Sequence, residues 1–102
     1  MAKVIALYKK PADTAAFDAH YWSKHMPLAK TMPGLRSYEV STGPITTPAG
    51  EAALHMLGIL TFDSMAAVQV ALSSPEGVAT AADLGNFAQA GVELLIFDTK
   101  QL

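Results

Sequence analysis

A histidine within a predicted helix is the residue of this sequence best suited to move a proton. Residues 14–31 have helical spacing, and at about 100° per residue His25 falls inside the apolar stripe, one turn after Tyr21. A histidine there points inward, and its ordinary pKa of about 6.5 suits general acid or base catalysis. We therefore predict that His25 is catalytic. The plainer interpretation, a core histidine hydrogen-bonded to a neighbour, stays open.

Pro27 lies two residues after His25 and disturbs the same helix. It has no N–H to donate to the carbonyl of Ser23, and its ring crowds that turn. His25 is therefore expected at a kink or near the end of a helical segment. Nearby helix carbonyls would favour the imidazolium and burial would favour the neutral ring, so the protonation state of His25 stays open at this point.

Aromatic side chains and a further histidine are candidates for the wall of a cavity around His25. Trp22 and Tyr21 flank it on the helix, although both could equally be core residues. Tyr8, Tyr38 or His55 would orient or polarise an oxygen atom of a ligand. Packing inside the sheet is the alternative for the two strand tyrosines. The substrate-binding residues that we predict are Tyr8, Tyr21, Trp22, Tyr38 and His55.

Spacing argues against a metal site. Two ligands on one helix should lie three or four residues apart, but His20 and His25 are five apart and His55 is on another element. His20 is expected to face solvent. The chain has no cysteine, which excludes disulfides, thiolate metal sites and thiol catalysis. It has no glycine-rich phosphate loop or dinucleotide fingerprint either, so we expect no metal and no cofactor.

Composition excludes some partners and favours another. The 102 residues are predicted to form one domain, residues 1–102, yet 51% are hydrophobic and 16% charged. So small a domain cannot bury that much apolar surface alone, which favours a homodimer. A net charge of −2 gives no basic patch for a nucleic acid. No stretch approaches the roughly 20 apolar residues of a membrane span, so we expect a soluble, cytoplasmic protein.

The elements that must position these residues follow the order βαββαβ. Apolar runs predict four strands, at residues 4–8, 35–42, 53–62 and 92–97. Helical spacing predicts helices at residues 14–31, 65–72 and 75–82. Residues 43–52 and 83–91 are expected to be loops. This order is typical of the ferredoxin-like α+β fold, with a four-stranded antiparallel sheet and helices on one face.

The last two predicted strands are apolar on both faces. Helices can cover one face of such a sheet, so the other must meet a partner. Two sheets that face each other across a homodimer would satisfy this requirement.

Two stretches of the sequence resemble a known family. The first is Phe17-x-x-x-Tyr21-Trp22-x-x-His25-x-Pro27-Leu28, followed by Met32-Pro33-Gly34-Leu35 and Tyr38. The second is Asp83-Leu84-Gly85-Asn86-Phe87. In this order and at this chain length, they resemble the EthD-type family over nearly the whole chain.

The resemblance implies a dimeric α+β barrel, in which each ferredoxin-like protomer pairs its sheet with that of its twin. It also implies an apolar cavity between sheet and helices, with His25 as the motif histidine beside Tyr21 and Trp22. Members of the family are linked to the degradation of ethers and aromatics. Relatives in the superfamily include cofactor-free monooxygenases, lactone isomerases, and polyketide cyclases or dehydratases.

We therefore predict a small cofactor-independent enzyme of a catabolic or biosynthetic pathway. Its substrate would be an apolar molecule with a carbonyl or phenol, and His25 would act as general acid or base in an isomerase, dehydratase or cyclase type of reaction. One alternative is a non-catalytic accessory protein that binds a small apolar or aromatic ligand. The other is a cofactor-free monooxygenase whose substrate itself activates oxygen.

Overall fold

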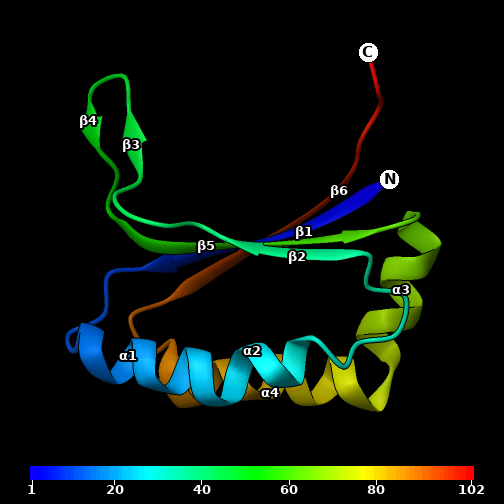
Figure 1. The fold of residues 1–102 in the computed structure, drawn as a ribbon, viewed down its shortest axis with the longest axis horizontal. Coiled ribbons are helices and arrows are strands. Elements are labelled where there is room, and N and C mark those ends of the chain that lie inside the picture. Colours follow the sequence, from blue (N-terminus) through cyan, green and yellow to red (C-terminus); the bar gives the residue numbers. More distant parts are fainter.

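The molecule has two layers, a four-stranded antiparallel sheet and a set of helices packed on one of its faces (Figure 1). The computed structural model describes residues 1–102. The strands of the sheet are β1 (Ala2–Lys9), β2 (Ser37–Val40), β5 (Leu54–Phe62) and β6 (Val92–Asp98). They lie in the order β2-β5-β1-β6, and all neighbours are antiparallel. This arrangement confirms the predicted ferredoxin-like α+β fold.

Two helical regions cross the same face of the sheet. The helical elements are α1 (Thr14–His20), the π-helical turn η1 (Tyr21–His25), α2 (Met26–Ala29), α3 (Met65–Ser73) and α4 (Pro75–Phe87). Asp13 caps α1, because its carboxylate accepts the N–H of Ala16 at 3.0 Å. Ser64 caps α3 in the same way, because its hydroxyl accepts the N–H of Ala67 at 3.1 Å. No helix is long and apolar enough to span a bilayer.

The period of two in β1 positions the core. Ala2, Val4, Ala6 and Tyr8 are buried against the helices, and the residues between them point to the opposite face. The antiparallel register places Val4 opposite Leu60 and Ala6 opposite Gly58 of β5, so both strands present one inner face. Two hydrophobic clusters result, one around Phe62 and Val68 and one around Tyr8, Phe17, Tyr21 and Phe87.

The first helical region is divided, whereas the sequence predicts one helix over residues 14–31. Pro27 has no N–H, and just before it the N–H of Met26 reaches back five residues to the carbonyl of Tyr21. This wider turn forms η1, and Pro27 then lies in the first turn of the short helix α2, where a missing N–H is tolerated. The predicted disturbance near His25 is therefore confirmed, and its form is a π-helical turn.

Two predicted loops contain regular structure. Within residues 43–52, Thr46–Thr47 (β3) and Gly50–Glu51 (β4) pair as a small hairpin that projects from the sheet on the side away from the helices (Figure 1). The predicted loop at residues 83–91 is wrong over residues 83–87, where α4 continues to Phe87, and is confirmed over residues 88–91. Gly85 and Asn86 are poor helix formers, but the burial of Phe87 outweighs that local preference.

The face of the sheet opposite the helices carries apolar side chains with no protein layer over them. We call this surface the open face; its apolar residues are Ile5, Leu7, Leu57, Ile59, Leu95 and Phe97. Along the edge strand β6, residues 94–97 are each 39–46% exposed. The hairpin and the C-terminal segment both project past the open face (Figure 1).

Candidate active site

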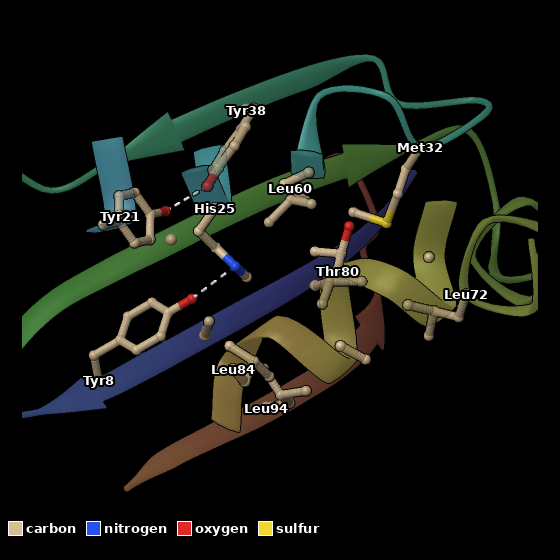
Figure 2. A pocket seen from close by; sticks show the side chains of 16 residues that line it. Tyr8, Tyr21, His25, Met32, Tyr38, Leu60, Leu72, Thr80, Leu84 and Leu94 are labelled. Carbon is tan, nitrogen blue, oxygen red and sulfur yellow. Dashed lines mark hydrogen bonds between the residues drawn. The ribbon is translucent and has the colours of Figure 1, made fainter. Parts of the chain in front are cut away.

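A cavity lies between the sheet and the helices. Its volume is about 70 Å³, and 12 of its 16 lining residues are hydrophobic. The apolar end of the cavity is lined by Met32, Leu60, Leu72, Leu84 and Leu94 (Figure 2). A cavity of this kind suits a small apolar molecule, whose orientation would be set by the polar groups at its other end.

Three tyrosines and His25 form that polar end (Figure 2). Tyr21 and Tyr38 are hydrogen-bonded to each other through their hydroxyls. The Tyr8 hydroxyl lies 3.5 Å from Nε2 of His25, at the outer limit of a hydrogen bond. These groups come from β1, η1 and β2, so the fold brings together four of the six predicted site residues.

Asp83 holds the other side of the His25 ring. Its Oδ2 lies 2.9 Å from Nδ1 of His25, across the contact between α4 and η1. Burial opposes the negative charge of Asp83, but hydrogen bonds from Asn86, His25 and His20 outweigh it and hold the pKa of that carboxyl below its usual value. An ionised carboxylate only accepts hydrogen bonds, so Nδ1 of His25 carries a proton.

His25 is therefore a neutral base that faces the cavity. The residue is 4% exposed, and this burial lowers its pKa below 6.5, although the hydrogen bond to Asp83 works in the opposite direction. In the neutral ring with a proton on Nδ1, Nε2 carries no proton and accepts hydrogen bonds. It lies at the polar end of the cavity, where it accepts the long hydrogen bond from the Tyr8 hydroxyl (Figure 2).

The phenols around this base are proton donors at neutral pH. Burial is the main cause that raises the pKa of Tyr8, Tyr21 and Tyr38 above the usual value of 10.0. Each hydroxyl therefore keeps its proton. Tyr8 donates its proton to His25 and one of Tyr21 and Tyr38 donates to the other, which leaves one phenolic proton of that pair for a ligand oxygen. A base and phenolic donors thus meet at one end of an otherwise apolar cavity.

His20 is a partner of the site, although the sequence predicts a solvated side chain. Its Nε2 lies 3.0 and 3.1 Å from the two carboxylate oxygens of Asp83, and its ring stacks on Phe87 with centroids 5.1 Å apart. The side chain is 21% exposed. The prediction that it faces solvent fully is wrong, because α4 continues far enough to place Asp83 and Phe87 beside it.

Trp22 and His55 do not line this cavity, and here the structure differs from the sequence-based expectation. Trp22 is 48% exposed, because it lies at the edge of the inward stripe. His55 is the surplus residue of a β-bulge, since Tyr8 pairs with Met56 and Lys9 with Leu54. Its ring contacts Phe17 and its Nε2 lies 2.8 Å from Asp18. Both residues line a separate hollow.

The family model described as EthD domain matches residues 9–91. The chain belongs to the EthD family. Over 99 residues this EthD chain is 40% identical to an uncharacterized 11.0 kDa protein of Rhodococcus erythropolis, covering 96% of this chain and 94% of that one. It is 35% identical to an EthD family protein of Bacillus halodurans, whose crystal structure superposes with a TM-score of 0.89 and covers 98% of this chain and 99% of that one.

More distant structures share the fold of this EthD protein. SnoaB, described as a cofactor-independent oxygenase from Streptomyces nogalater, is 14% identical with a TM-score of 0.69, covering 99% of this chain and 94% of that one. Proteins from Bacteroides fragilis and Thermobifida fusca, described as dimeric and ferredoxin-like, are 18% and 16% identical. At these identities the likeness shows the fold alone.

Asp83 is the site residue of this EthD chain that sequence reasoning missed. The sequence places Asp83 in the predicted loop at residues 83–91 and so outside any helix, although Asp83 is the first residue of the second stretch that resembles the family. A signal was present in the apolar spacing of Leu84 and Phe87, which continues the face of Gly77 and Thr80 at helical intervals. Extending the helix by that spacing would have placed Asp83 on α4.

Proposed function

We propose that this EthD protein is a small cofactor-independent enzyme that acts on an apolar molecule with a carbonyl or phenol group. The observation that carries the proposal is the unprotonated Nε2 of His25, which lies at the polar end of an apolar cavity and accepts a long hydrogen bond from the Tyr8 hydroxyl. His25 is the general base and, after it has taken a proton, the general acid. Asp83 orients its ring and stabilises the imidazolium.

A substrate carbonyl at the polar end would accept a hydrogen bond from the remaining phenolic proton of the Tyr21 and Tyr38 pair. His25 Nε2 would then remove a proton from the carbon next to the carbonyl, and the electron pair of that C–H bond would move onto the oxygen as an enolate. Return of the proton to a different carbon gives an isomer. Its delivery to a leaving hydroxyl gives dehydration, and attack of the enolate carbon on a second carbonyl gives a ring.

Carbon-bound proton exchange tests this chemistry before the substrate is known. A panel of apolar ketones and phenols would be incubated with the protein in D2O and followed by NMR. Proton abstraction predicts deuterium at the carbon next to the carbonyl, or at ring carbons of a phenol, faster than in buffer. Compounds that bind tightly without exchange or conversion would instead support the alternative of an accessory protein that holds an apolar ligand.

A cofactor-free monooxygenase is the second candidate function. The same base could ionise a bound phenol, and an electron-rich phenolate can itself supply the electrons that reduce O2. SnoaB, which has the same fold, is described as a cofactor-independent oxygenase, and this supports the second candidate function. Oxygen uptake that depends on an added phenol would support it, whereas conversion at an equal rate without oxygen would support the isomerase, dehydratase or cyclase chemistry.

The rate should fall on the acid side as His25 takes up a proton. Burial lowers the pKa of His25, so the base form persists below pH 6.5. We expect kcat/KM to be level near neutral pH and to decline about tenfold per pH unit below an inflection under 6.5. The check is a profile of kcat/KM from pH 4.5 to 8, with the fold monitored by circular dichroism. An acid limb that begins above 6.5 would contradict this assignment.

We infer that the open face is covered by a second copy of the chain. The face is apolar, the hairpin and C-terminal segment project past it, and two proteins of the same fold are described as dimeric. Replacing Ile59 by lysine should give a folded monomer, because the new charge lies on this face opposite Glu39, which can pair with it. Light scattering during gel filtration would measure the mass.

The matched control for this substitution is Val70→Lys. Val70 is 64% exposed on α3, on the helical side of the molecule. This substitution adds the same charge as Ile59→Lys but on the helical side, away from the open face, so the dimer should persist. An Ile59→Lys protein that keeps the dimer mass would show that the second copy binds to a different surface.

A further inference from the structure

One carboxylate joins two histidines that face different surroundings. His25 contacts Oδ2 of Asp83 from the cavity side. His20 contacts both oxygens of the same group from an outer hollow, which it lines together with Asp13 and Asn86. A change in the charge of His20 therefore alters the electrostatic environment of His25 through their shared partner, Asp83.

The shared carboxylate cannot neutralise two imidazolium ions. When His20 is protonated it takes up the negative charge of Asp83, so a second proton on His25 would lack a full counter-charge. The titrations of the two rings are therefore coupled. The charge of His20 acts in the same direction as burial and further lowers the pKa of His25, while the hydrogen bond to Asp83 raises it.

We propose that His20 is a positioning residue which, through Asp83, keeps His25 unprotonated as the pH falls. This inference rests on the proposed role of His25 as the base. While His20 carries a proton it shares the negative charge of Asp83, and the inner histidine stays free to accept a proton from the substrate.

The other groups around the pair do not compete for this role. From the cavity side, His25 contacts the hydroxyl of Tyr8 on β1, and its ring packs on the ring of Tyr21 in η1. Burial raises the pKa of both phenols, so they stay neutral. On α4 the facing charged group is Asp83, which Asn86 holds with a hydrogen bond of 2.9 Å. On the outer side, Asp13 from the start of α1 shares the hollow with His20.

The test is an NMR titration of the histidine rings in the full chain without substrate, for the wild type and His20→Gln. Glutamine can still donate a hydrogen bond to Asp83 but cannot become charged. The pKa of His25 should rise by about half a unit or more in this variant, because the carboxylate then serves His25 alone. An unchanged or lower pKa for His25 would overturn the proposal.

Lys24→Gln is the matched control. Lys24 lies one turn after His20 and is exposed, so its replacement removes a nearby positive charge that has no contact with Asp83. It should leave the titration of His25 close to that of the wild type. An equal rise in Lys24→Gln and His20→Gln would mean a general effect of net charge, which also overturns the proposal.

The wild type alone offers a second measurement that needs no variant to fold. Coupling predicts that the ring signals of His25 change in two steps, one of them at the pH where His20 titrates. A single inflection for His25, with no response where His20 titrates, would count against the coupling.

The proposed function has its own, separate readout. A protein that shows coupling but never exchanges carbon-bound protons would retain the charge coupling and lose its proposed enzymatic role. If the protein is active, the acid limb of its kcat/KM profile should lie at higher pH in His20→Gln than in the wild type, because the pKa of His25 rises in that variant. An active protein whose acid limb stays in place would keep the proposed function and refute the role of His20.

Discussion

Replacing His25 by glutamine should lower turnover, or the rate of carbon-bound proton exchange, by about 100-fold or more. The physical reason is that glutamine fills a similar volume and can still donate to Asp83, but it has no group that accepts a proton near neutral pH. The variant loses the neutral imidazole, whose Nδ1 is held by the carboxylate at 2.9 Å and whose unprotonated Nε2 lies at the polar end of the cavity. The measurement is kcat/KM on the best compound of the panel.

Two checks separate loss of the base from loss of the fold. The far-ultraviolet circular dichroism spectrum and the mass in solution should match those of the wild type, because glutamine preserves the packing. Ligand binding should change by much less than turnover, since the apolar end of the cavity is untouched. A variant that retains the wild-type rate would remove His25 from the mechanism and bring the accessory-protein alternative forward.

Replacing Gly77 by alanine should destabilise the protein by about 3 kcal/mol. Gly77 is buried in the first turn of α4, where the chain has just left α3. A Cβ atom there would lie 2.0 Å from the carbonyl oxygen of Ala71 and 2.8 Å from the Cα atom of Leu72. Both obstacles are backbone atoms, so the two helices would have to separate. Urea unfolding followed by circular dichroism measures the loss.

Gly85 provides the matched control on the same helix. A Cβ atom at Gly85 meets nothing within 4 Å, and its φ does not lie in the left-handed region. Alanine is the better helix former by roughly 1 kcal/mol, so Gly85→Ala should leave stability unchanged or raise it. A Gly77→Ala protein whose free energy of unfolding lies within about 1 kcal/mol of the wild-type value would mean that α3 and α4 can separate at little energetic cost, contrary to the close contact at Ala71.

Local patterns were sufficient to predict the fold and the inward histidine. The alternation of β1 depends on neighbours two residues apart, and the placement of His25 depends on the turn that contains Tyr21. Both are properties of a short segment with one apolar face. The phenols of Tyr8 and Tyr38 could be nominated in the same way, because strand residues that point to the helical layer are recognisable from their neighbours.

The partner of that histidine could not be found from local patterns alone. Asp83 lies 58 residues from His25 in the sequence, and only the packing of α4 on η1 brings the two together. Local preference at Gly85 and Asn86 favoured a loop, which the burial of Phe87 overrode. His55 was misplaced for a similar reason, since the bulge that redirects it is a property of the pairing between β1 and β5.

The divided first helical region has a consequence for how the segment around His25 is held in place. α1 has seven residues and α2 has four, and helices so short do not persist in water by themselves. The segment between them, which carries His25, is therefore ordered by its packing against α4 and the rest of the core. The geometry around His25 therefore depends on that packing, so the titration of His25 in the native protein reports that α4 is packed on η1.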